Sequence, residues 1–472
     1  MTARPADPTA RSRDLSVDVA RVLCLLAVVA IHTAMIGIGG SAGESGHSPA
    51  VGEGNAQRLE VTNPLTELWF FAVGTWLGQV MPLFFLLGGF GAYMAMRSAR
   101  SATDLLDELP TDDFARHLRR RTLRLGPPAA IFYTVMAGLT LLMVLTGLPA
   151  QMLDPALEGA GDPLWFLAAF LICQGFVRRQ YRLVTTASAV RRWAVLGVMV
   201  AGIICVDTLR MIWAGQQSSA GDGLVVIGTA GTWADMLGLL NMWLLWPVMQ
   251  LLGMMLAHGC WDRVRWWGWA LTAVGSFSVT AALATWTWYP ADMLINLNPP
   301  TLPLLSIGMT QVALFQLLRP VLAAAARRRS VQVVMALIAS RAMTLYLWHM
   351  VVIILLNGVI WLLGWAPEPG SALWWWTRIP MMLTAVAVTL VVTWKLAALE
   401  RPRPVLPVRR WGIPLGWTAL YLAVVPNLVV TWQGLTTVTV WVGVVLLGVA
   451  VLLAGAPWAA AGRAHAGAPR VG

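Results

Sequence analysis

The sequence predicts an all-α protein that crosses a membrane many times. Hydrophobic residues make up 58% of the 472-residue chain and charged residues 12%, about half the charged share of an ordinary globular protein. Long apolar runs recur from Val17 to Ala456, and many reach the roughly 20 residues that a helix needs to cross a bilayer. This composition excludes a disulfide-bonded secreted domain, a nucleic-acid-binding protein and a soluble enzyme.

The apolar runs divide into twelve predicted spans, ten before a break in the pattern and two after it. The break at 400–410 contains three Pro and four Arg, and prolines of this kind do not continue a helix. The spans are predicted at 17–39, 68–96, 125–148, 162–177, 193–213, 236–257, 267–289, 303–325, 342–363, 372–394, 412–431 and 436–456. We therefore expect an N-terminal tail at 1–16, a membrane core at 17–404, two additional transmembrane helices at 405–456 and a C-terminal tail at 457–472.

The distribution of positive charge predicts how the spans are oriented. If the N-terminus is cytoplasmic, 29 of the 33 Lys and Arg residues fall in cytoplasmic segments, as the positive-inside rule requires. The net charge of +11 therefore reflects topology and does not indicate a nucleic-acid partner. No small-residue cleavage site follows the first span, so we expect that helix to be retained. The protein is predicted to lie in the inner cell membrane with both termini in the cytoplasm.

Disulfide and metal chemistry are not indicated. The four cysteines are scattered, with no C-x-x-C pair and none in an outer loop, so we interpret them as apolar core residues. A metal site needs about three clustered His, Cys or carboxylate ligands, and we expect none. The chain also lacks the G-x-S-x-G, Walker and H-E-x-x-H motifs, which mark several common enzyme classes.

The first span carries charged and titratable groups, which are costly in a bilayer and usually functional. Asp18 and Arg21 lie at its cytoplasmic end, and His32 lies beyond its midplane. The spacing between Arg21 and His32 places them on nearly the same helix face, about 16 Å apart. Arg21 as a headgroup anchor and His32 as a satisfied structural histidine are the alternatives. A neutral imidazole at this depth would suit a general base that takes a proton from an external hydroxyl.

Three further residues are candidates for a substrate cavity. His349 is the second intramembrane histidine, and Tyr346 precedes it by one helical turn. Trp165 lies near the start of the fourth span. Structural packing is the alternative for each of them. The outer loops also carry acidic and aromatic residues that would suit a sugar and would equally suit an ordinary wet surface, namely Glu60, Glu67, Trp69, Asp162, Trp165, Asp235 and Asp292.

Six short motifs follow one another along the chain. They are Asp18-x-x-Arg21 with His32, Met81–Phe90, Arg120–Pro128, Leu164–Leu167, Tyr346–His349 and Leu399–Pro402. In this order they resemble the motifs of the acyltransferase-3 family of membrane acyltransferases, over roughly residues 14–404. Gly88 stands where the family usually has Ser, which puts the role of that hydroxyl in doubt. The resemblance says nothing about the two trailing spans.

The resemblance implies a ten-helix core that transfers an acyl group, commonly acetyl or succinyl, from cytoplasmic acyl-CoA to an acceptor hydroxyl. Acceptors in the family include cell-envelope glycans and small secondary metabolites. By this resemblance His32 would be the catalytic base, and Arg21, with Asp18 beside it, would bind or orient the donor. The phosphates of CoA would be met by Arg120, Arg121 and Arg124. Acyl-CoA would be a co-substrate, and the partners would be the bilayer, the donor and a glycan or other hydroxylated acceptor.

Two other classes of function stay open at this point. A transporter or flippase of a small or lipid-linked substrate would use Asp18, Arg21 and His32 as a relay. It would not release free thiol from acyl-CoA, whereas an acyltransferase supplied with its acceptor would. A family member without catalysis would serve as a membrane partner, although the presence of both Arg21 and His32 argues against it. The acyl group, the acceptor and the oligomeric state are not determined by the sequence.

Overall fold

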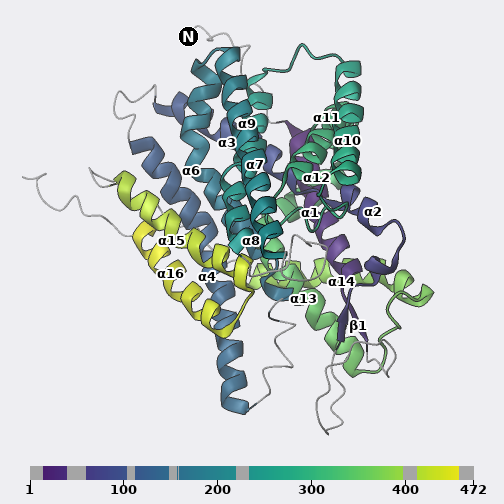
Figure 1. Cartoon of the computed structure of the whole chain (residues 1–472). Helices are drawn as coiled ribbons and strands as arrows, with labels where there is room; N and C mark the ends of the chain where they lie inside the picture. Colours follow the sequence, from purple (N-terminus) through teal and green to yellow (C-terminus); the bar gives the residue numbers. More distant parts are fainter. Residues whose placement is uncertain are drawn as a thin grey trace, which may run out of the picture.

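The computed structural model describes residues 14–39, 60–103, 112–147, 157, 159–218, 233–396 and 412–455. Within these residues, twelve segments are long and apolar enough to cross a membrane, which confirms an all-α polytopic membrane protein (Figure 1). The elements are α1 (Leu15–Met35), β1 (Gly37–Gly39), β2 (Glu60–Thr62), η1 (Pro64–Glu67), α2 (Phe71–Gly78), α3 (Met81–Thr103), α4 (Asp112–Thr146), α6 (Leu164–Thr186), α7 (Ala189–Ser218), α8 (Trp233–Gly238), η2 (Leu239–Trp243), α9 (Leu245–His258), α10 (Trp266–Trp286), α11 (Leu302–Ala325), α12 (Arg329–Ala339), α13 (Ala342–Leu362), α14 (Ala372–Leu396), α15 (Gly412–Gln433) and α16 (Thr437–Gly455).

Several helices extend beyond the predicted spans at their charged ends, and α4 and α6 show this most clearly. The third span is predicted from residue 125, but α4 begins at Asp112, so the arginine-rich segment is the first part of that helix. The fourth span is predicted to end at residue 177, but α6 continues to Thr186. Hydropathy ends a span at its first arginines. The helix itself continues because its backbone hydrogen bonds do not depend on side-chain polarity, and long Arg side chains reach back to water.

The core of the bundle is built from α3, α6 and α9. Every residue from Leu245 to Ala257 of α9 is buried, and so is most of α6. Glycines let α3 and α9 approach closely, because a Cβ atom on Gly253 would overlap the carbonyl oxygen of Leu86 and one on Gly89 would overlap that of Gln250. Small residues of this kind allow the van der Waals packing that drives helix association in lipid.

Helix α1 is held at both of its ends. Asp14 caps its start by accepting a hydrogen bond from the Ser16 backbone N–H at 3.0 Å, and it forms an ion pair with Arg319 of α11. Burial raises the pKa of the Asp14 carboxyl, but hydrogen bonds from Ser16 and the Arg319 guanidinium outweigh burial and hold that pKa below its ordinary value. At the other end, Arg378 of α14 donates to the carbonyl oxygen of Thr33 at 3.3 Å, one of the groups that a helix C-terminus leaves without an internal partner.

A buried carboxylate organises the loop between α10 and α11. Asp207 of α7 accepts hydrogen bonds from the Tyr289 hydroxyl at 2.8 Å, the Leu302 backbone N–H at 2.9 Å and the Asn241 side chain at 2.8 Å. These bonds join α7 and η2 to the loop between α10 and α11. Beyond the end of α1, strand β1 pairs with β2 in an antiparallel ribbon.

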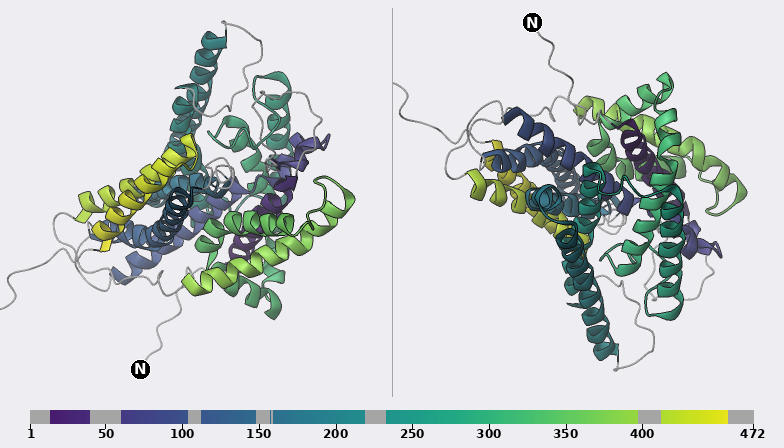
Figure 2. Two further views of the ribbon diagram at one scale, coloured as in Figure 1. Left: turned by 90° about the horizontal axis from the view of Figure 1, so that it is seen from below. Right: turned by 90° about the horizontal axis from the view of Figure 1, so that it is seen from above.

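The last two helices are packed into the bundle. α15 and α16 lie side by side against α4 and α6 (Figures 1 and 2). The Tyr133 hydroxyl of α4 donates to Asn427 of α15 at 3.3 Å, and Arg119 of α4 donates to the carbonyl oxygen of Ala454 in α16 at 2.8 Å. Leu435, in the turn between α15 and α16, packs against Gly161 just before α6. These contacts connect the pair to the turn that leads into the core.

We expect Gly253→Ala to destabilise the protein, because the added methyl group would meet the Leu86 carbonyl and separate α3 from α9. Overpacking of a tight core costs about 1–3 kcal/mol, so the purified variant should unfold at a lower temperature in detergent. Gly275→Ala is the matched control, since a Cβ atom there has no neighbour within 4 Å. Equal unfolding temperatures for the parent and Gly253→Ala would contradict the close approach of the two helices.

Candidate active site

Two intramembrane histidines meet in the interior of the bundle. Nδ1 of His32, on α1, lies 2.7 Å from Nε2 of His349, on α13, and the planes of the two rings differ by 9° with centroids 5.0 Å apart. On the far side of its ring, His349 Nδ1 lies 2.6 Å from the backbone carbonyl oxygen of Tyr346. His349 is fully buried, whereas His32 keeps partial contact with solvent.

This chain of hydrogen bonds determines which nitrogen of each neutral imidazole carries a proton. A carbonyl oxygen only accepts, so Nδ1 of His349 is protonated and its Nε2 carries the lone pair. That lone pair accepts from His32, whose Nδ1 is therefore protonated as well. The remaining nitrogen, Nε2 of His32, keeps its lone pair. It is the nitrogen that can act as a base.

Asp162 adds a carboxylate to the histidine pair. It lies in the turn before α6 and interacts electrostatically with His32 and with Tyr346. Asp162 is an exposed residue in the structure. From the sequence, Asp162 is one of several loop residues suited to a sugar, and no pattern in the sequence predicts its approach to His32. The one indication in the sequence is the predicted depth of the two residues in the bilayer. Asp162 begins the fourth span on the same side of the predicted midplane as His32.

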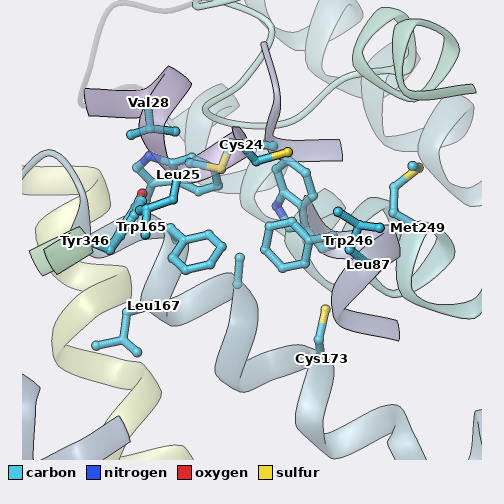
Figure 3. Packing of buried hydrophobic residues seen from close by; sticks show 14 of the residues in the cluster. Cys24, Leu25, Val28, Leu87, Trp165, Leu167, Cys173, Trp246, Met249 and Tyr346 are labelled. Carbon is cyan, nitrogen blue, oxygen red and sulfur yellow. The ribbon is translucent and has the colours of Figure 1, made fainter. Parts of the chain in front are cut away.

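Tyr346 lies beside His349, and Trp165 belongs to the same buried apolar cluster. Trp165 is 6% exposed and Tyr346 is 4% exposed, so both are packed among other side chains. The ring centroid of Tyr346 lies 5.6 Å from that of His349. Figure 3 shows Trp165 and Tyr346 in one cluster with Leu25 of α1. Burial at these two positions indicates that they pack the interior and do not form wide surfaces open to solvent.

Arg21 lies toward the opposite end of α1 and faces another cation. Its guanidinium donates to the backbone carbonyl of Leu87 on α3, and a guanidinium nitrogen lies 3.9 Å from a carboxylate oxygen of Asp18. Gly91 makes room for this side chain, because a Cβ atom there would overlap the guanidinium. Arg121 of α4 interacts electrostatically with Arg21. Two guanidinium groups held near one another attract an anion, and phosphate and carboxylate match their geometry.

The three arginines predicted to meet the donor differ in their surroundings. Arg121 is partly buried and interacts electrostatically with Arg124 as well as with Arg21. Arg124 is exposed. Arg120 is also exposed, and it interacts electrostatically with His117 on its own helix. The structure therefore brings Arg121 toward Arg21, whereas Arg120 and Arg124 lie at the surface.

Gly88, where the family usually has Ser, directly follows the residue whose carbonyl binds Arg21. A Cβ atom on Gly88 would lie 3.6 Å from the ring of Phe170, which is an ordinary contact. Packing would therefore admit a serine, so crowding is not the reason for the glycine. The motif Leu399–Pro402 lies outside the described residues.

The comparisons with known proteins bear on the same residues. The acyltransferase-3 family model, described as an acyltransferase domain, matches residues 14–397. That range holds the helices from α1 to α14 and includes the histidine pair, Asp162 and the arginines of α1 and α4. Comparisons with curated proteins and with solved structures give no match. The family match confirms the resemblance seen in the motifs, and the chain belongs to the acyltransferase-3 family of multi-pass membrane acyltransferases.

Proposed function

We propose that the protein transfers an acetyl or succinyl group from acyl-CoA to a hydroxyl of a cell-envelope glycan or another carbohydrate-like acceptor. The contact between His32 and His349 carries this proposal, because it leaves Nε2 of His32 as a free base within a membrane acyltransferase. The solvent contact of His32 and Asp162 supports access by a polar acceptor. A small hydroxylated metabolite is the alternative acceptor.

His32 acts as the general base of the proposed reaction. Its Nε2 takes the proton of the acceptor hydroxyl while the hydroxyl oxygen attacks the carbonyl carbon of the thioester. The C–S bond then breaks, the ester remains on the acceptor, and the CoA thiolate receives the proton from His32. Throughout, Nδ1 of His32 keeps its hydrogen bond to His349, so the pair needs no rearrangement. In its ionised form, Asp162 would favour the imidazolium that forms between the two proton transfers.

The cations around Arg21 form the proposed donor site. A planar guanidinium binds phosphate through two parallel hydrogen bonds, and Arg121 and Arg124 add positive charge. Along α1, Arg21 and His32 are about 16 Å apart, a distance that the pantetheine arm of CoA would bridge. The positive-inside distribution supports a cytoplasmic position for these arginines. We therefore propose that both termini lie in the cytoplasm and that the protein lies in the inner membrane.

The role of His32 is tested by the masses of envelope and secreted saccharides from cells that express the parent, His32→Ala or neither. We expect an acyl-sized mass increase with the parent alone, because loss of a general base slows a reaction by about 10²–10⁴-fold. An equal increase with His32→Ala would remove His32 from the chemistry. If no saccharide gains mass, release of free thiol from acyl-CoA in the presence of small hydroxylated acceptors separates acyl transfer from transport.

His349 is a positioning residue. Its role can be tested with a replacement side chain that still accepts a hydrogen bond from His32. We expect His349→Leu to lower kcat by about 10–100-fold, because His32 loses the group that orients its ring and sets its tautomer. His349→Gln should recover much of that loss, since its side-chain oxygen can accept from Nδ1 of His32. The KM for acyl-CoA should stay the same in both variants. Equal losses in the two variants would contradict the tautomer role.

Arg21→Lys should weaken donor binding, because an ammonium group lacks the planar fork of a guanidinium. A hydrogen bond to a charged group contributes about 1.5–3 kcal/mol, so we expect the Kd of acyl-CoA to rise by roughly tenfold or more. Arg263→Lys, at an exposed turn between α9 and α10, is the matched control. Unchanged affinity for acyl-CoA in Arg21→Lys would count against a donor-binding role.

A further inference from the structure

A cavity of about 720 Å³ lies between α6, α7 and the first part of α9. Its size falls within the range of small-molecule pockets, roughly 300–1,000 Å³. None of the residues that line it belongs to the site built around His32 and Arg21. Most of its wall is apolar, with Phe176, Met199 and Trp243 among the larger side chains. The cavity is therefore a separate feature of the membrane domain.

Three arginines supply the charge of this cavity, and their side chains are exposed. Arg179 and Arg182 lie on α6, and Arg191 lies in the first turn of α7. Within the part of the chain that the structure describes, no hydrogen bond or ion pair engages their guanidinium groups, and no Asp or Glu lines the cavity. The adjacent Arg192 differs, because its guanidinium donates to the sulfur of Cys260 at 2.8 Å. The cavity thus presents three cations without an anion.

The depth of the cavity matches one leaflet of a bilayer. Its lining on α6 runs from Thr186, where the helix ends, to Phe176. Ten residues of α-helix rise about 15 Å, which is half of the roughly 30 Å hydrocarbon thickness. On α7 the lining runs from Arg191 to Met199, a rise of about 12 Å. Arg182 and Arg191 therefore lie near the connection between the two helices, and Phe176 and Met199 lie at the other end of the cavity, with Arg179 about one turn from Phe176.

We propose that this cavity binds an anionic phospholipid. The phosphate lies between Arg182 and Arg191, and one acyl chain follows the apolar wall toward Phe176 and Met199. Guanidinium groups bind phosphate oxygens in a planar fork, and basic pockets between transmembrane helices bind anionic headgroups. The cavity is separate from the proposed donor site, because the cations around Arg21 lie on α1 and α4.

The test uses the full-length protein in detergent and measures bound lipid by native mass spectrometry. Phosphatidylglycerol and phosphatidylcholine are supplied separately in mixed micelles at matched concentrations. We expect the parent to bind phosphatidylglycerol at least tenfold more tightly than phosphatidylcholine. The triple variant with Arg179→Gln, Arg182→Gln and Arg191→Gln should lose this preference, while its unfolding temperature without added lipid stays that of the parent.

Two further variants make the result specific. The matched control replaces three exposed arginines on another helix connection, Arg327→Gln, Arg328→Gln and Arg329→Gln, and should keep the tenfold preference. Val195→Trp fills the apolar half of the cavity and should weaken phosphatidylglycerol binding while the three arginines remain.

Three results would overturn the proposal. The first is equal affinity of the parent for the two lipids, and the second is an unchanged preference in the triple variant of Arg179, Arg182 and Arg191. The third is displacement of phosphatidylglycerol from the parent by micromolar acyl-CoA or by inorganic phosphate, which would assign the cavity to the donor or to a free anion. The readout is independent of acyl transfer, so it stands whether or not the proposed reaction is correct.

Discussion

The hydrogen bond between His32 and His349 is the contact on which the site depends. Water is scarce inside a bilayer, and a polar group left there without a partner costs several kcal/mol. Two neutral imidazoles together carry two donors and two acceptors. The bond between the rings and the bond to the Tyr346 carbonyl use three of these groups and leave one acceptor. The cost of burying polar atoms thus limits the pair to one free lone pair and assigns it to His32.

The hydrogen bond between His32 and His349 requires α1 to keep a fixed position against α13. The contacts at the two ends of α1 hold the helix in that position. Asp14 and Arg319 hold its first turn to α11, while Arg378 of α14 holds its last turn. The helix therefore carries a cationic group near one end and the histidine contact near the other, at a separation that its own rise determines. In the proposed reaction this rigid spacing sets how far the donor must reach, and the bilayer keeps the two substrates on separate sides.

Hydropathy predicted the twelve spans because a membrane-crossing helix satisfies its backbone groups locally, so each span is recognisable from its own residues. Helical periodicity likewise placed Arg21 and His32 on one face. Partners across helices follow from no local pattern. His349 lies 317 residues from His32, and the sequence marked it as a candidate without pairing the two. Asp162 was missed as a partner because a carboxylate at the end of a span resembles ordinary wet surface until the facing helix is known.

The packing of α15 and α16 affects how far the chain can be shortened without disturbing the rest of the bundle. These helices follow the residues that match the family model, so a truncated protein designed from the family match alone would lack them. A chain that ended after α14 would lose the partner of the buried Tyr133 hydroxyl and would uncover the face of α4 that holds Arg119. It would also remove Leu435 from Gly161, the neighbour of Asp162. The packed helical unit of this protein is therefore longer than its family domain.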